Sequence, residues 1–189
     1  MARRLVECGH EVTMVCGSYR GGETGLIAAF TIGRRRGMVD GIEVIEFNLD
    51  YSNGDGFIRR SMTFMKYVFR SISLGLIERF DLVFATTTPL TASIPGILAH
   101  WLRGETFIFE VRDLWSELPK AMGVICNPLV LSAMSVLEWV SYHLANRLID
   151  LSSGIVKGIE RRDVPPGRIT LVSNACDLVF LLVKPSLSD

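Results

Sequence analysis

Short apolar runs alternate along this chain with longer segments in which apolar residues recur every three or four positions. The short runs predict strands and the longer segments predict helices, because the two elements expose and bury side chains with different periods. The predicted strands are Val12–Cys16, Ile42–Phe47, Leu82–Ala85, Phe107–Val111, Leu148–Leu151 and Ile169–Val172, and the predicted long helices are Ile58–Arg79, Pro89–Leu102, Leu129–Asn146 and Gly154–Arg162. This alternation is typical of βαβ units, so we expect an α/β fold with a Rossmann-like, doubly wound and mostly parallel sheet.

The chain opens with a short predicted helix over Ala2–Cys8, which Gly9 closes, and no strand comes before it. In a doubly wound sheet the first strand is central, and the turn after it often carries a glycine-rich ligand loop. We therefore expect the first strand to be missing and the sheet to show an open gap. The segment Gly17–Gly41, which includes Arg34-Arg35-Arg36, is predicted to be a long loop.

The composition fits one globular domain. The chain has 189 residues, 49% of them hydrophobic, and its 20 Lys and Arg residues equal its 20 Asp and Glu residues, so no net charge favours nucleic acid as a partner. Cysteines occur without a C-x-x-C pair and without a histidine at ligand spacing, which makes a metal site unlikely on sequence grounds and predicts reduced core thiols. The cysteines are Cys8, Cys16, Cys126 and Cys176.

Charged and hydroxyl residues follow three of the predicted strands. Arg112, Asp113 and Glu117 come after Phe107–Val111, while Thr86-Thr87-Thr88 and Ser152-Ser153-Gly154 follow two others. In open α/β sheets ligands bind beyond the carboxyl ends of the strands, so these residues are candidates for chemistry and substrate binding. The alternatives are structural: a solvated helix start with an internal ion pair at Arg112, and helix caps at Thr88, before Pro89, and at Ser152.

The predicted helix Ile58–Arg79 is amphipathic. Its cations Arg59, Arg60, Lys66 and Arg70 are candidates for facing an anionic membrane surface, with Arg34-Arg35-Arg36 as an addition. Met65, Phe69, Ile72 and Leu76 gather on the opposite side of the helical wheel from Arg59, Lys66 and Arg70. The alternative is an ordinary helix that covers the sheet and packs this apolar side on the core.

Several motifs, taken together, resemble a known family. The most specific is Glu110-Val111-Arg112-Asp113-Leu114-Trp115, accompanied by Thr86–Thr91, Leu151–Ile155, Asn174–Asp177 and, near the start, Arg3–Thr13. The chain resembles the N-terminal domain of GT-B glycosyltransferases of family 4, close to the WbuB-like enzymes of surface polysaccharide synthesis. It departs from the family's R-D-L-W-P-E pattern at Ser116, and from P-N-G-C-D at Ser173 and Ala175.

The resemblance implies a retaining transfer from a nucleotide-sugar donor to a glycan or polyprenyl-diphosphate-linked acceptor, without a metal or other cofactor. Residues 1–173 would be the acceptor-side domain and residues 174–189 the start of the interdomain hinge, while the donor-binding C-terminal domain is absent from this sequence. Within that scheme Asp113 would orient or deprotonate the acceptor hydroxyl with Glu117 nearby, Arg112 would contact a phosphate, and Asn174 would belong to the hinge.

Two other functions stay open. A sugar-nucleotide epimerase shares the two-domain architecture but would need histidines and carboxylates in the crevice. A truncated, non-catalytic fragment would act only by binding, and we expect this chain alone to be inactive even where its parent protein is a glycosyltransferase. The expected location is the cytoplasm, with peripheral attachment to the inner face of the cell membrane as the further expectation.

Overall fold

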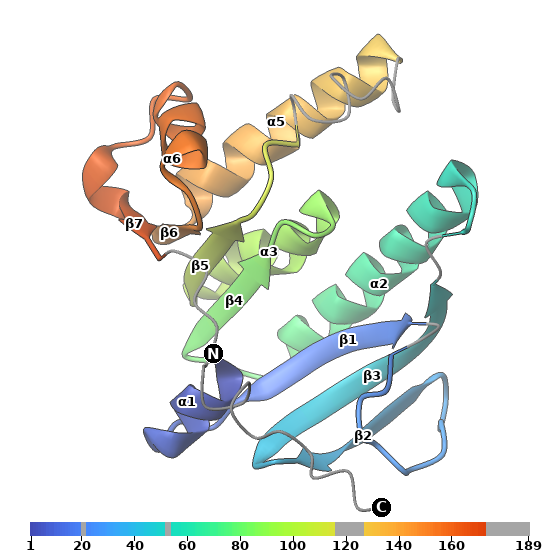
Figure 1. The fold of residues 1–189 in the computed structure, drawn as a ribbon. Helices are drawn as coiled ribbons and strands as arrows, with labels where there is room; N and C mark the ends of the chain where they lie inside the picture. The colour runs from blue at the N-terminus through green and yellow to red at the C-terminus, as the bar shows by residue number, and fades with distance from the viewer. Residues whose placement is uncertain (20–21, 52–53, 116–126, 173–189) are drawn as a thin grey trace, which may run out of the picture.

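The computed structural model describes residues 1–19, 22–51, 54–115 and 127–172. Three strands follow the first helix, and from the third strand onward strands and helices alternate as the sequence predicts (Figure 1). In chain order the elements are α1 (Ala2–Glu7), β1 (Thr13–Tyr19), β2 (Arg34–Val39), β3 (Ile42–Tyr51), α2 (Phe57–Ile77), β4 (Leu82–Thr86), the 3₁₀ helix η1 (Leu90–Ala92), α3 (Ser93–Arg103), β5 (Thr106–Val111), α5 (Pro128–Leu144), β6 (Arg147–Asp150), α6 (Ser153–Glu160), the 3₁₀ helix η2 (Pro166–Arg168) and β7 (Ile169–Leu171).

The described strands form two sheets, whereas the sequence predicts one. The first sheet has the order β1-β3-β2, in which β1 runs parallel and β2 antiparallel to β3. The second has the order β4-β5-β6-β7, and all its strands are parallel. Helices flank this parallel sheet (Figure 1), so the predicted Rossmann-like α/β class is confirmed.

Two strands whose apolar sequences are typical of the interior of a sheet lie at sheet edges. Among the described residues, β1 and β4 each pair with a strand on one side only. Their apolar runs, residues 14–16 and 82–85, are typical of strands buried on both faces, yet both runs are only partly buried. By contrast, the edge strand β2 exposes Arg34 and Arg36, and charges of this kind discourage pairing with another chain. Within the described ranges, β1 and β4 thus each leave one edge without a paired strand.

The predicted loop over Gly17–Gly41 is wrong in its second half, which contains β2. Exposed residues alternate along β2 with half-buried ones, which is typical of a strand that has one face toward solvent and the other toward the protein. Asp40 and Gly41 join β2 to β3 with φ values of 51° and 77°. Positive φ at both central residues is the geometry of a tight two-residue hairpin, and Asp-Gly is a preferred sequence for it. The sequence analysis assigned this stretch to a loop because it contains three consecutive charged residues, Arg34-Arg35-Arg36.

Helix α2 turns a different face to the core than the sequence predicts. Val68 and Leu74 are buried, whereas the predicted core residues Met65, Phe69 and Leu76 are exposed. The helical wheel did not decide between the two faces, because apolar residues also occur on the side of Val68 and Leu74. As a result, α2 carries an apolar stripe on its solvent side.

The second sheet has a buried core that is rich in aromatic side chains. Phe107 and Phe109 of β5 and Tyr142 of α5 are fully buried, and the centroid of the Phe109 ring lies 5.8 Å from that of Phe107 and 6.3 Å from that of Tyr142. Helix α3 approaches β5 closely at Gly96, where an added Cβ would lie 2.3 Å from Cε2 of Phe107. A side chain at this position of α3 would therefore force the helix away from the sheet.

The first sheet contains a buried carboxylate beside its apolar cluster. Glu46 of β3 is only 3% exposed, although the neighbouring strand positions Ile45 and Phe47 belong to the apolar cluster of this sheet. Its Oε2 accepts a hydrogen bond from Nε of Arg35 at 2.9 Å and one from the Thr24 hydroxyl. Ser18 donates to the other oxygen at 3.0 Å, so both carboxylate oxygens are satisfied.

The cysteine prediction holds for one of the two described cysteines. Cys16 is half-buried in β1, and burial, reinforced by the nearby Glu46 charge, raises the pKa of its thiol to about 11. Cys8 is exposed at the end of α1, so it is not a core thiol, and both are free. Cys126 and Cys176 lie outside the described residues.

Candidate functional site

The carboxyl ends of β4, β5 and β6 lie side by side. Thr86 pairs with Glu110, and Val111 pairs with Asp150, so the strands end at the same edge of the sheet. The structure therefore brings together the segments that the sequence singled out after each strand, namely Thr86-Thr87-Thr88, Arg112-Asp113 and Ser152-Ser153-Gly154. Glu117 and Asn174 lie outside the described residues.

Thr87 links two of these strand ends. Its backbone N–H donates to the carbonyl of Glu110 at 3.0 Å, and its hydroxyl accepts from the backbone N–H of Arg112 at 2.8 Å. Thr87 is fully buried, so its hydroxyl holds the start of the Arg112 segment in place. Thr86 is half-buried, and its hydroxyl has no hydrogen-bond partner among the described residues.

Thr88 does not cap the following helix. Pro89 takes the N-cap position of η1 with an extended backbone, the Thr88–Pro89 peptide is cis, and no side chain caps this end. The α-helix α3 begins only at Ser93. The predicted cap at Thr88 is therefore wrong, and the exposed Thr88 side chain lies at the strand-end edge without a capping role.

Arg112 forms its ion pair with the strand that precedes it. Its Nε lies 3.0 Å from Oε2 of Glu110, whose side chain is 11% exposed, while the Arg112 side chain is 52% exposed. The sequence alternative placed this pair among Arg112, Asp113 and Glu117, and the partner in the described structure is Glu110 instead. Glu110 binds only some of the N–H groups of the exposed Arg112 guanidinium, so the other N–H groups stay available to solvent.

Asp113 and Trp115 follow Arg112 in an irregular segment. Asp113 is half-buried, and Trp115 packs against the core of the second sheet. The indole N–H of Trp115 is buried and has no partner among the described residues. Leu114, between them, lies close to α6, where a Cβ at Gly158 would be 2.5 Å from Leu114 Cδ1. This packing holds the Asp113 segment against α6.

Ser152 caps α6, as the structural alternative predicted. Its hydroxyl accepts from the backbone N–H of Ile155 at 3.4 Å, and Ser153 and Gly154 form the exposed first turn of the helix. Asp150 lies just before this turn and is fully buried. Its Oδ1 accepts from the backbone N–H of Ser152 at 3.0 Å, which fixes the geometry of the turn.

Asp150 is the residue of this edge that the sequence analysis missed. Its Oδ2 has no hydrogen-bond partner among the described residues. Burial raises the pKa of Asp150, and the backbone N–H groups of Ser152 and Leu151 oppose this effect only in part. A carboxylate that ends the otherwise apolar run Leu148–Ile149 was the available signal. Perturbed, incompletely satisfied carboxylates are typical of functional sites.

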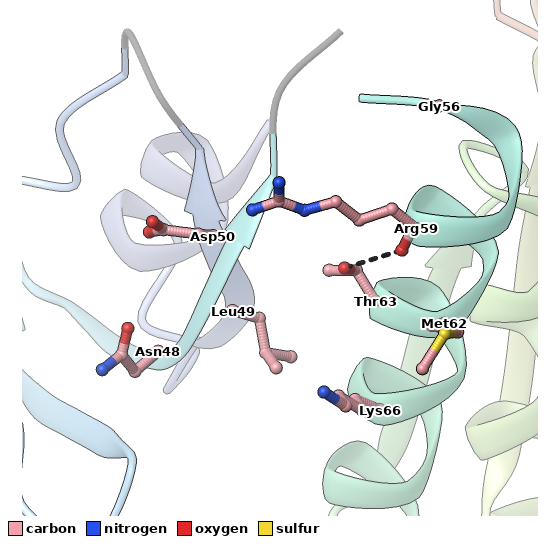
Figure 2. Close-up of a pocket in the computed structure, with 8 residues that line it drawn as sticks. All are labelled: Asn48, Leu49, Asp50, Gly56, Arg59, Met62, Thr63 and Lys66. Carbon is pink, nitrogen blue, oxygen red and sulfur yellow. Dashed lines mark hydrogen bonds between the residues drawn. The ribbon is translucent and has the colours of Figure 1, made fainter. Parts of the chain in front are cut away.

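A pocket of about 780 Å³ lies between the carboxyl end of β3 and the first turns of α2. Figure 2 shows Arg59 and Lys66 extending from α2 toward β3, with Leu49 between them. The residues that line the pocket are Asn48, Leu49, Asp50, Gly56, Arg59, Met62, Thr63 and Lys66. The pocket thus combines two cations with one carboxylate and apolar side chains.

The four cations proposed to face a membrane do not share one surface. Arg59 and Lys66 line the pocket, and Arg59 Nε lies 3.5 Å from Oδ1 of Asp55. Arg70 turns toward the first sheet, where it donates to the carbonyl of Gly33 at 2.9 Å. Arg60 is half-buried. A common basic face of α2 is therefore limited to Arg59 and Lys66.

The arginine run of β2 is largely engaged within the protein. Arg35 bonds to Glu46, and Arg36 forms ion pairs with Glu43 and Glu78 at 2.6 and 2.7 Å. Arg34 is exposed and makes no ion pair with a described residue. Arg36 is also exposed, so Arg34 is the arginine of this run that combines exposure with no ion pair to a described residue.

In the part of the chain that the structure describes, no cluster of side chains is suited to metal binding, and no histidine follows a strand. No group of three His, Cys, Asp or Glu residues there is arranged to hold a metal ion. His100 lies in α3 and His143 in α5, so neither follows a strand. None of the helices over the described ranges is both long and apolar enough to cross a membrane.

The four-stranded parallel sheet and its flanking helices define an α/β domain of the Rossmann type. A model of the glycosyl transferase 4-like domain matches residues 1–175, and the chain belongs to this family. Membership indicates a glycosyltransferase, in agreement with the resemblance seen in the sequence. A comparison with curated proteins gave no match.

Proposed function

We propose that this chain is the acceptor-binding part of a retaining glycosyltransferase. The donor would be a nucleotide sugar, and the acceptor a glycan or a polyprenyl-diphosphate-linked sugar in surface polysaccharide synthesis, as in WbuB-like enzymes. The observation that carries the proposal is the edge at which Thr86–Thr88, Arg112-Asp113 and Ser152–Gly154 meet, in a chain of the glycosyl transferase 4-like family. Ligands of open α/β sheets bind at this end of the strands.

The proposed reaction joins the acceptor oxygen to the anomeric carbon of the donor sugar. The bond from that carbon to the phosphate oxygen of the nucleotide breaks, and the hydroxyl proton passes to a base or to the departing phosphate. Asp113 is assigned to orient or deprotonate the acceptor hydroxyl, and Glu117, four residues further along the sequence, is assigned to assist in the same step. Arg112, whose guanidinium is partly exposed, is assigned to a phosphate oxygen.

The remaining strand-end groups are assigned to substrate binding. The exposed Thr88, Ser153 and Gly154 offer hydroxyl and backbone N–H donors at the same edge, and Asn174 is assigned to the hinge. The donor would be held by a separate C-terminal domain, and the transfer would require no metal. The acceptor's location at a bilayer fits a cytoplasmic protein attached peripherally to the membrane.

The test replaces Asp113 by Ala in the full-length protein that carries this domain. We expect turnover of sugar transfer to fall by about 100-fold or more, since general-base catalysis contributes on that scale, while nucleotide-sugar affinity stays near normal. The matched control is Asp81→Ala, which removes an exposed carboxylate just before β4, at the opposite end of the strand. Unchanged turnover in the Asp113 variant would remove Asp113 from the site.

A further inference from the structure

We propose that a groove between the start of β2 and the second half of α2 binds an extended acidic segment of a partner protein, in which carboxylates lie next to apolar side chains. The groove has a volume of about 600 Å³, which is in the range of ligand pockets. It shares no lining residue with the pocket at the start of α2, and it is separate from the strand ends of the second sheet. The inference therefore goes beyond the proposed function and does not depend on it.

The charge of the groove favours carboxylates as ligands. None of the described residues that line it is Asp or Glu, whereas its cations are Arg34, Arg35, Arg36 and Arg70. Arg35 and Arg36 already pair with carboxylates of β3 and with Glu78. Arg34 and Arg70 make no ion pair with a described residue, so two guanidinium groups stay available to an acidic ligand.

Gly33 positions the Arg70 guanidinium in the groove. Nη1 of Arg70 donates to the carbonyl of Gly33 at 2.9 Å, and a Cβ on Gly33 would lie only 3.0 Å from Nη2 of Arg70. The contact thus depends on a residue without a side chain. A guanidinium carries more N–H donors than this contact uses, and its planar fork matches the two oxygens of a carboxylate. Arg70 is therefore held in place with donors to spare.

Ile32 lines the groove in a strained backbone conformation. Its φ is 51°, that of Gly33 is 72°, and backbone hydrogen bonds between Thr31 and Arg34, at 2.8 and 3.1 Å, close the turn. Positive φ costs free energy at a β-branched residue and almost none at glycine. The Ile32 side chain is 98% exposed, so the fold gains nothing from burying it. A ligand that covers Ile32 would provide the burial that the fold does not.

The combination of free cations and exposed apolar side chains fits an acidic protein segment best. Ile77 lines the groove from α2 and is 77% exposed. A free phosphate would use only the cations, and a polysaccharide, covered with hydroxyls, would leave Ile32 and Ile77 without an apolar partner. A nucleotide base stacks on an aromatic face, but Phe47, the aromatic residue of the lining, is 3% exposed. Arginine clusters recognise acidic peptide motifs.

The test measures binding of a fluorescein-labelled synthetic peptide to the full-length chain by fluorescence anisotropy. In the probe, single Leu residues alternate with pairs of Glu residues. One comparison peptide carries Gln in place of each Glu, and a second carries Ser in place of each Leu. We expect the chain to bind the probe and to bind each comparison peptide about tenfold more weakly or less, because charged hydrogen bonds and apolar burial each contribute on that scale. Absence of binding to the probe would overturn the proposal.

Two single variants assign the binding to the groove. Arg34→Gln removes an exposed guanidinium that has no ion pair in the described structure, and it should weaken probe binding about tenfold. Ile32→Gly removes the apolar contact and also the strain at positive φ, so it should weaken probe binding without lowering the melting temperature. Loss of binding with unchanged stability separates a lost contact from a misfolded chain.

Matched controls make the same changes outside the groove. Arg147→Gln removes an exposed cation at the start of β6, and Asp163→Gly places glycine at another exposed position with positive φ, 62°. Neither control should weaken probe binding. An equal loss in Arg147→Gln would mean that net charge alone drives binding, and would overturn the proposal. Normal binding by both Arg34→Gln and Ile32→Gly would overturn it as well.

Two competitors distinguish a protein segment from other anions. Inorganic phosphate and polygalacturonate, an acidic polysaccharide, should each displace the labelled peptide only weakly, because neither can contact Ile32 with an apolar side chain. If polygalacturonate displaces the peptide and binds Ile32→Gly as tightly as the unmodified chain, the groove takes an acidic polysaccharide and the proposal fails. If inorganic phosphate abolishes peptide binding, the groove takes a free anion and the proposal fails in the same way.

Discussion

The two sheets each bury a carboxylate, and they treat it in opposite ways. In the first sheet, burial alone would raise the pKa of Glu46, but the hydrogen bonds from Thr24, Arg35 and Ser18 outweigh it and the pKa is lowered. In the second sheet, burial raises the pKa of Asp150, and only backbone N–H groups oppose it. The difference separates a carboxylate with both oxygens hydrogen-bonded from one at the strand-end edge whose Oδ2 has no partner among the described residues.

The same comparison extends to how each sheet is stabilised. The first has a small apolar cluster around Ile45 and Phe47, beside the Glu46 network. The second relies on the apolar contacts of Phe107, Phe109 and their neighbours. Substitutions that remove apolar volume should therefore be most damaging in the second sheet, and substitutions that remove a charge should be most damaging in the first.

The largest effect is expected from Phe109→Ala. Phe109 is fully buried between Phe107 and Tyr142, so its removal leaves a cavity and should lower the free energy of unfolding by about 4 kcal/mol. Trp101→Ala is the control, because Trp101 is 73% exposed and its loss should change stability by only about 0.5 kcal/mol. Urea denaturation measures both, and similar losses in the two variants would contradict the account of this core.

Glu46→Ala should lower the free energy of unfolding by somewhat less, about 3 kcal/mol. The change leaves the half-buried Arg35 without its carboxylate partner. The control Glu160→Ala removes an exposed carboxylate from α6 and should have little effect. In Glu46→Ala/Arg35→Ala the two losses should not add, since both residues belong to one network. Additive losses would show that the pair does not act as a unit.

The smallest effect should distinguish the two carboxylates by the direction in which stability changes with pH. The pKa of Glu46 is lowered from its ordinary 4.5, so its contribution is present above that pH and is lost as the pH falls through the folded value. The pKa of Asp150 is raised from 3.8, so its contribution is present below 3.8 and is lost as the pH rises through the folded value.

The measurement is urea denaturation between acidic and neutral pH. Relative to the unmodified protein, Glu46→Gln should be less stable at neutral pH and Asp150→Asn more stable, and both differences should shrink as the solution is acidified. The two variants thus shift stability with opposite signs. Parallel shifts would mean that burial, and not the number of hydrogen-bond donors, sets the behaviour of both groups.

The fold class followed from the sequence because apolar runs and helical periods record burial directly. The strand ends after Leu82–Ala85, Phe107–Val111 and Leu148–Leu151 were placed closely enough to predict which polar segments meet. The buried face of α2 was not predicted correctly, since apolar residues occur on two sides of the helix and only tertiary packing selects between them. The structural role of Thr87 and the burial of Asp150 were also missed, because both depend on the pairing of neighbouring strands.

The close approach of α3 to β5 has a consequence for how this chain can vary among related sequences. Since a Cβ at Gly96 would lie 2.3 Å from the Phe107 ring, the glycine and the phenylalanine form a coupled pair. A larger residue at position 96 becomes acceptable only after position 107 has become smaller, whereas a smaller residue at 107 first opens a cavity. Substitutions at the two positions are therefore expected to occur together, and a lineage must pass through a destabilised intermediate to exchange them.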